Sequence, residues 1–209
     1  GHLVLFRQLF GLNGEGSLFF SVMLHLGTLV AVIAAFYADV WAMIKEVGYC
    51  FGDIFRGRFS FKTDSPHRKM LFMLVLASLP LVLVLLFKGA VENVTQDNDI
   101  VMEGFFFLIT AGLLFLSCKM KPGRAKIRQM KPQTAVALGV VQSLAAFPGI
   151  SRSGSTISAG TIFGFDRQFM VKFSFLMSIP AILGSAVFEI GDAVEQGVNV
   201  KFLPVALGI

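Results

Sequence analysis

A nine-residue polar segment, Pro148 to Thr156, interrupts the apolar second half of the chain and reads Pro-Gly-Ile-Ser-Arg-Ser-Gly-Ser-Thr. It holds one arginine, four hydroxyl side chains and two glycines. The guanidinium of Arg152 is a planar fork of N–H donors that matches the oxygens of a phosphate group. Glycine permits a ligand to approach the backbone closely, and the N–H groups at the start of a following helix attract an anion. The segment therefore predicts a phosphate-binding site, unless Arg152 is merely solvated in a Ser/Gly turn.

Two further polar residues lie inside apolar stretches of the chain. His25 interrupts one long apolar run, and Gln142 interrupts another just before the polar segment. A lone histidine in such a run can hydrogen-bond a neighbouring helix or line a site. For Gln142 we hold two interpretations, contact with a substrate and bracing of the local structure.

The composition indicates the environment in which these residues work. The chain has 209 residues, of which 55% are hydrophobic and only 15% charged, and it holds 23 phenylalanines. Its mean hydropathy is +0.75. So much apolar mass cannot be hidden inside a water-soluble domain of this size, so we predict an integral membrane protein. The net charge of +5 resides in loops between apolar runs, which indicates membrane topology rather than nucleic-acid binding.

Charge asymmetry between the loops predicts how the chain crosses the membrane. Residues 39–69 and 119–131 each hold six Lys or Arg, whereas residues 88–103 hold one Lys and four acids, and residues 189–201 one Lys and three acids. The positive-inside rule places the first two loops in the cytoplasm and the other two outside. The spans predicted from length and apolarity are Leu18–Tyr37, Leu71–Phe87, Gly104–Cys118 and Phe169–Ile190.

Between the cytoplasmic loop at 119–131 and the outer loop at 189–201, the chain must cross an odd number of times. Phe169–Ile190 supplies one crossing, so residues 134–165 should contribute none. We therefore expect a re-entrant hairpin over 134–165 that turns at Pro148–Ser155. Irregular backbone at this depth is tolerated only where protein or a watery cavity satisfies it, which makes the turn a candidate site.

A weak internal repeat supports an inverted topology. Shifting the chain by 153 residues aligns Gly1 with Gly154, Phe10-Gly11 with Phe163-Gly164, and Phe20-Ser21 with Phe173-Ser174. The two spans thereby matched run in opposite directions. We expect one all-α membrane domain over 1–209, a polytopic helix bundle with inverted repeats and re-entrant hairpins. Residues 1–133 form most of the first repeat with its basic loops, and 134–209 begin the second.

The polar segment also resembles a family motif. PGISRSGST is similar to the PGxSRSGxT motif of the bacterial undecaprenyl-diphosphate phosphatases, the bacitracin-resistance protein family. The opening GHL resembles the end of the family's SSTGHL motif, and Phe20 to Leu29 resembles the helix that follows it. The resemblance implies hydrolysis of undecaprenyl diphosphate to the monophosphate and inorganic phosphate. That reaction recycles the lipid carrier for cell-wall synthesis, gives bacitracin resistance, and places the chain in the bacterial plasma (inner) membrane as a multi-pass protein.

The resemblance also assigns roles residue by residue. Arg152 matches the motif arginine that holds the diphosphate, and Ser151, Ser153, Gly154 and Thr156 match the binding positions around it. His2 matches the histidine of SSTGH, a general acid/base or nucleophile. The family's divalent cation, Mg²⁺ or Ca²⁺, is linked to an acidic segment that would precede residue 1, so we expect this chain alone to be inactive. The partners implied are the polyprenyl diphosphate and membrane lipids, with a homo-oligomer left open.

A second class of function stays open on the residues themselves. Inverted repeats with broken helices at the membrane midplane are also typical of transporters, and an anion site can carry a lipid as well as cleave it. The alternative is therefore a membrane transporter or lipid flippase. Release of phosphate distinguishes the two, because transport leaves the diphosphate intact.

Overall fold

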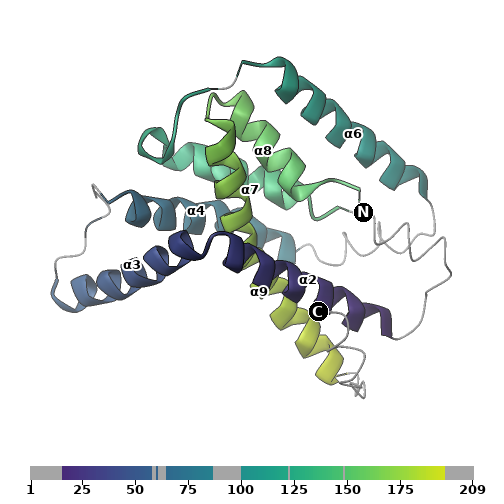
Figure 1. Ribbon diagram of the computed structural model, residues 1–209. Coiled ribbons are helices and arrows are strands. Elements are labelled where there is room, and N and C mark those ends of the chain that lie inside the picture. Colours follow the sequence, from purple (N-terminus) through teal and green to yellow (C-terminus); the bar gives the residue numbers. More distant parts are fainter. Residues whose placement is uncertain are drawn as a thin grey trace.

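The computed structural model describes residues 16–57, 60, 65–86, 100–121, 123–147 and 149–195. In these residues the chain forms helices and no strand, which confirms the predicted all-α class (Figure 1). The helices are α2 (Gly16–Ala35), α3 (Tyr37–Phe55), α4 (Pro66–Leu86), α6 (Ile100–Lys119), the short 3-10 helix η1 (Ile127–Gln129), α7 (Pro132–Leu144), α8 (Arg152–Ile162) and α9 (Arg167–Glu195).

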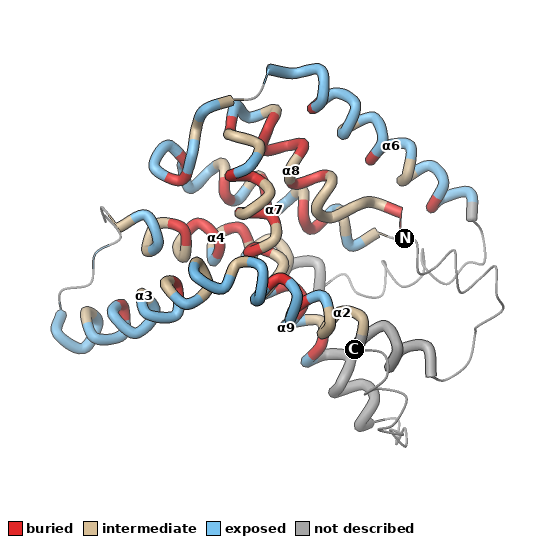
Figure 2. Tube along the Cα trace, in the orientation of Figure 1, coloured by how far each residue is buried: buried red, intermediate tan, exposed pale blue. Residues whose placement is uncertain are grey.

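Two of the described helices are long and apolar enough to cross a membrane. They contain the segments Val101–Lys119 in α6 and Arg167–Val187 in α9, which confirms two of the predicted spans. The first is largely exposed, with Leu108 71% accessible, and Figure 2 shows α6 mostly in the colour of exposed residues. An apolar helix with so little protein around it is suited to contact with lipid.

The first predicted span and the loop after it differ from expectation. A helix does cover most of Leu18–Tyr37, but α2 ends at Ala35 and the chain bends by 90° into a second helix, α3. Residues 37–55, predicted as part of a basic loop, are thus helical. The helix is stabilised because one of its faces is buried. Met43 and Cys50 lie on that face, and α3 packs against α4.

Helices α7 and α8 form a hairpin of two half-length helices. They contain 13 and 11 residues, about 20 and 16 Å at about 1.5 Å per residue, whereas a span needs about 20 residues. The chain enters α7 after the basic loop and returns to that loop after α8, because the Asp166 N–H donates to the carbonyl of Ala125 (2.9 Å). The start of α7 and the end of α8 therefore lie at the same end of the molecule.

The hairpin is held in the bundle by close packing of small residues. Helix α4 packs along α7, while α8 contacts α6, α7 and α9. A Cβ atom on Gly139 of α7 would lie 2.3 Å from the carbonyl oxygen of Ala77 in α4, and one on Gly160 of α8 would lie 2.2 Å from Met170 Cε in α9. Glycine at these points lets the helix axes approach closely enough to fix the hairpin.

Helices α2 and α9 lie together and run in opposite directions. The ring of Phe36, just after α2, stacks on Phe175 near the start of α9 with centroids 5.9 Å apart. Three residues away from these rings, in α3 and α9 respectively, Asp39 forms an ion pair with Lys172. The end of α2 is therefore beside the beginning of α9, and the inverted repeat itself stays a prediction. The repeat boundaries at residues 133 and 134 remain a prediction.

Candidate functional site

The polar segment begins helix α8. Ser151 is the N-cap residue, and its Oγ accepts a hydrogen bond from the Gly154 N–H (3.1 Å). This satisfies one of the free N–H groups at the helix start. The turn therefore ends at Ser151 rather than at Ser155 as predicted, and Arg152 to Ser155 form the first helical turn. Arg152 and Ser153 are left with N–H groups that have no acceptor within the helix.

The turn before α8 rests on the middle of α6. The Ser151 N–H donates to Thr110 Oγ1 (3.1 Å), and Thr110 Oγ1 donates to the carbonyl of Phe106 (3.1 Å). Gly149 has φ +100° and approaches so closely that a Cβ there would lie 2.7 Å from the carbonyl oxygen of Glu103. Because Thr110 lies near the midpoint of the 20-residue helix α6, the start of α8 lies at about half the height of that span.

Arg152 is half-buried at this position. None of the described residues offers it an acidic partner. His25 of α2, the other predicted polar residue of an apolar run, is also half-buried and lies within electrostatic range of Arg152. An arginine at such depth without a counter-ion is costly, and its natural complement is an anionic ligand.

The Thr156 side chain is buried and its hydroxyl is engaged by other protein groups. It is fully buried, its Oγ1 donates to the carbonyl of Arg152 (2.9 Å), and its hydroxyl lies 2.6 Å from Ser174 Oγ of α9. The hydroxyl thus fastens the turn that carries Arg152 to the neighbouring span. We interpret Thr156 as a positioning residue, while its direct contact with a diphosphate stays a prediction.

The remaining predicted residues fall into three situations. Ser153 is half-buried beside Arg152, and Gly154 must be small because a Cβ there would lie 2.8 Å from Ser151 Oγ. Gln142 is 1% exposed, and neither its Oε1 nor its Nε2 has a hydrogen-bond partner among the described residues. A buried amide without a partner is unusual, so a ligand-facing role for Gln142 remains open. His2 lies outside the described residues.

The described residues do not themselves assemble a cluster of metal-binding side chains. No group of three or more His, Cys, Asp or Glu side chains there could hold an ion. The motif resemblance implies a divalent cation whose ligands are expected before residue 1, so this cation stays a prediction.

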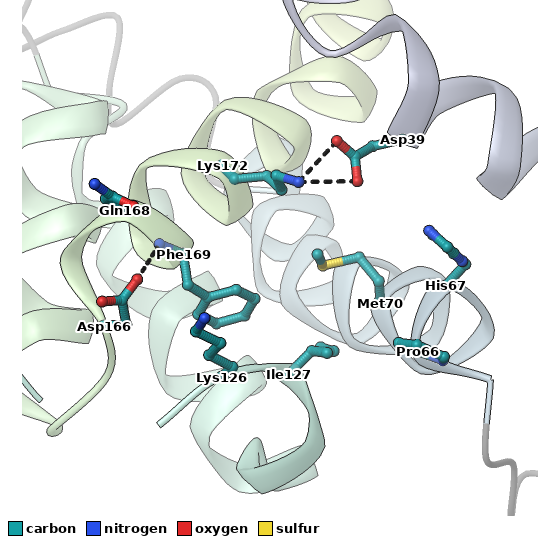
Figure 3. A pocket seen from close by; sticks show the side chains of 10 residues that line it. All are labelled: Asp39, Pro66, His67, Met70, Lys126, Ile127, Asp166, Gln168, Phe169 and Lys172. Carbon is teal, nitrogen blue, oxygen red and sulfur yellow. Dashed lines mark hydrogen bonds and ion pairs between the residues drawn. The ribbon is translucent and has the colours of Figure 1, made fainter. Parts of the chain in front are cut away.

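A cavity of about 330 Å³ lies at the base of the hairpin rather than at its turn. Figure 3 shows the charged side chains Asp39, Lys126 and Lys172 around it, with Met70 and Phe169 among the apolar ones. Because it lies where α7 begins and α8 ends, this cavity is separate from the Arg152 turn.

Two supporting residues could not be identified from the sequence. Thr110 and Ser174 lie inside apolar spans, where an isolated hydroxyl usually bonds to its own helix. The only signal was positional, since Ser174 aligns with Ser21 in the internal repeat. Their partners, Ser151 and Thr156, lie 41 and 18 residues away along the chain.

The fold defines a class, an α-helical membrane protein, whose candidate anion site lies at the start of a half-length helix. The chain matches, over residues 1–209, the family model described as Bacitracin resistance protein BacA, and it belongs to this family.

Curated relatives carry a consistent name. An undecaprenyl-diphosphatase of Methanobrevibacter smithii is 38% identical over 194 residues, covering 91% of this chain and 69% of the relative. One of Alkaliphilus metalliredigens is 36% identical over 199 residues, covering 95% and 72%. Undecaprenyl-diphosphatase 4 of Bacillus thuringiensis is 34% identical over 196 residues, covering 93% and 67%.

Proposed function

We propose that this protein hydrolyses undecaprenyl diphosphate to undecaprenyl phosphate and inorganic phosphate. The observation that carries the proposal is Arg152, half-buried at the start of α8 and without an acidic partner among the described residues. The names of the relatives supply the substrate. Recycling of the lipid carrier for cell-wall synthesis, and bacitracin resistance, follow from this activity.

Arg152 and the start of α8 stabilise the phosphate charge in the proposed reaction. The guanidinium and the free N–H groups of Arg152 and Ser153 face the oxygens of the terminal phosphate. Ser151 Oγ accepts from Gly154, so its own O–H remains available to donate. These donors are fixed before the substrate arrives, which is the condition under which they stabilise developing charge most effectively.

Bond cleavage in this proposal needs a nucleophile and a proton carrier. Water attacks the terminal phosphorus, the bond from that phosphorus to the bridging oxygen breaks, and undecaprenyl phosphate leaves. A histidine takes the proton from the water. His2 is the candidate from the motif, and His25, which lies within electrostatic range of Arg152, is the second candidate.

We also propose how the site lies in the membrane. The half-length helices α7 and α8 form a re-entrant hairpin that opens toward the basic loops, which lie in the cytoplasm of a bacterial cell. Arg152 then lies near the bilayer midplane, level with Thr110. The isoprenoid tail lies along the exposed apolar helices, and the protein is a multi-pass component of the plasma membrane.

Phosphate release from undecaprenyl diphosphate in detergent tests the hydrolase against the transporter. The full-length gene product should release inorganic phosphate, and its Arg152→Ala variant should release it about 10²-fold or more less efficiently. The Arg128→Ala variant is the matched control, because Arg128 belongs to η1 in the basic loop, remote from the turn. A folded wild-type protein that moves the lipid between leaflets with the diphosphate intact would establish the transporter instead.

A further inference from the structure

Helix α3 turns its acidic side chains toward the protein. Asp39 contacts Lys172 of α9 through both carboxylate oxygens (3.0 and 2.9 Å), as Figure 3 shows. Glu46 and Asp53 both bind Arg68 of α4, at 3.0 and 2.8 Å. All the carboxylates of this helix are therefore paired on its inner side.

The opposite side of α3 carries an exposed apolar stripe. Five large side chains, each between 49% and 89% exposed, follow one another at intervals of four, three, seven and four residues: Tyr37, Trp41, Ile44, Phe51 and Phe55. This spacing places them on one face of a helix. In a helix bathed in water the two sides would be reversed, with the charged side chains facing outward.

Helix α3 leaves the bundle at a sharp angle to α2 and packs beside α4. It is bent by 90° from α2, and Figure 1 shows it extending away from the crossing of α2 and α9. Its first turn lies at the basic end, because Asp39 lines the same cavity as Lys126 of the basic loop. With α2 upright in a bilayer, α3 therefore lies parallel to the membrane surface on the side of the basic loops.

Two features indicate what covers the stripe. The single tryptophan and both tyrosines of the chain, Trp41, Tyr37 and Tyr49, all belong to α3, and these residue types prefer the membrane–water interface. The cations that α3 presents outward are Lys45, 5.7 Å from the Trp41 ring centroid, and Arg56 at its end. With the acids paired inward, this face is complementary to an anionic leaflet.

We propose that α3 is an interfacial helix whose stripe, Tyr37, Trp41, Ile44, Phe51 and Phe55, inserts into the lipid leaflet on the side of the basic loops, with anionic headgroups beside Lys45 and Arg56. The helix thereby fixes the depth of α2 and, through the Asp39–Lys172 pair, of the start of α9. Interfacial helices of this kind bury their apolar face about 5–10 Å into the boundary of headgroups and acyl chains.

Fluorescence of Trp41 tests this depth directly. The full-length protein is reconstituted into vesicles whose lipids carry bromine either near the headgroup or near the chain end, and the Trp41→Phe variant supplies the background. We expect blue-shifted emission that shallow bromines quench more strongly than deep ones, and little quenching by aqueous iodide. Brominated anionic lipid should quench more than brominated zwitterionic lipid at the same mole fraction.

Two reference positions calibrate the depth scale in the Trp41→Phe background. Leu108→Trp on the exposed face of α6 should report the bilayer interior, and Lys131→Trp in the basic loop should report water. Quenching of Trp41 by iodide alone would overturn the proposal, because α3 would then lie in solvent. Quenching by neither agent would also overturn it, in favour of a second copy of the chain or another protein segment covering the stripe. Equal quenching by the two headgroup classes would overturn the anionic preference.

Discussion

At the scale of single residues, the site depends on how Arg152 is held. Its own turn is capped by Ser151, fastened to α6 through Thr110, and fastened to α9 through Thr156 and Ser174. Each of these bonds fixes the backbone from which the guanidinium extends. The cation is thus presented by a rigid frame, which is what electrostatic stabilisation of a phosphoryl group requires.

Replacement of Thr156 separates positioning from binding. Thr156→Val keeps the shape but removes the hydroxyl that bonds to the Arg152 carbonyl and to Ser174. Leaving Ser174 Oγ buried without this partner costs about 1–3 kcal/mol, and the displaced arginine should lower kcat by roughly tenfold or more. Thr156→Ser, which restores the hydroxyl, should recover most of the rate in a phosphate-release assay. If the serine variant is as slow as the valine variant, the hydroxyl is not what matters.

At the scale of elements, the hairpin is positioned by close helix contacts. Helix α7 approaches α4 at Gly139, and α8 approaches α9 at Gly160. The half-length helices cannot span a bilayer on their own, so their stability comes from this packing rather than from surrounding lipid.

Gly139→Ala tests the α4–α7 contact. The new Cβ would lie 2.3 Å from the Ala77 carbonyl oxygen, so the helices must separate, at a cost of about 1–3 kcal/mol for overpacking. Gly184→Ala in α9 is the matched control, because nothing lies within 4 Å of its added Cβ, and alanine there should be neutral or stabilising by up to about 1 kcal/mol. Thermal unfolding in detergent measures both. Equal melting temperatures for the two variants would contradict the packing described.

Helix α3 should make part of the protein's stability dependent on pH. Burial alone would raise the pKa of Glu46, but hydrogen bonds from Ser65 and Arg68 outweigh it and hold that pKa below its ordinary value. A depressed pKa in the folded state means that the stabilisation is present above the ordinary pKa and is lost as the pH falls through the folded one. The pair is near the surface, so we expect at most about 1 kcal/mol.

Glu46→Gln is the variant that reports this effect. It should melt at a lower temperature than the wild type near neutral pH, where the wild-type carboxylate is charged, and the difference should shrink in acid below about pH 4. Measurement of the melting temperature across this range checks the sign. A difference that grows on acidification would contradict the assignment.

At the scale of the whole molecule, the apolar runs and the loop charges predicted the helical class and the spans at α6 and α9. The loop charges also predicted the paired half-length helices, because they require an odd number of membrane crossings between residues 131 and 189. The helix α3 was not predicted, because its charged residues indicate a solvated loop until their partners Lys172 and Arg68 are known. Those partners lie as far as 133 residues away along the chain.

The residues of the candidate site could be identified from the sequence only in part. Arg152, Ser151 and Gly154 could be identified because they are contiguous and carry the chemistry themselves. The distance of His25 from Arg152 depends on how α2 packs, and the support from Thr110 and Ser174 depends on single hydroxyls inside spans. Long-range contacts of this kind leave no local pattern in the sequence.

The most direct test of the central claim is the steady-state kinetics of undecaprenyl diphosphate hydrolysis by the full-length protein and its Arg152→Ala, Arg152→Lys and Arg128→Ala variants. We predict that Arg152→Ala loses about 10²-fold or more in kcat/KM. Arg152→Lys should recover only part of this, because an ammonium lacks the planar fork, and Arg128→Ala should match the wild type. A folded Arg152→Ala variant that hydrolyses the lipid at the wild-type rate would contradict the account.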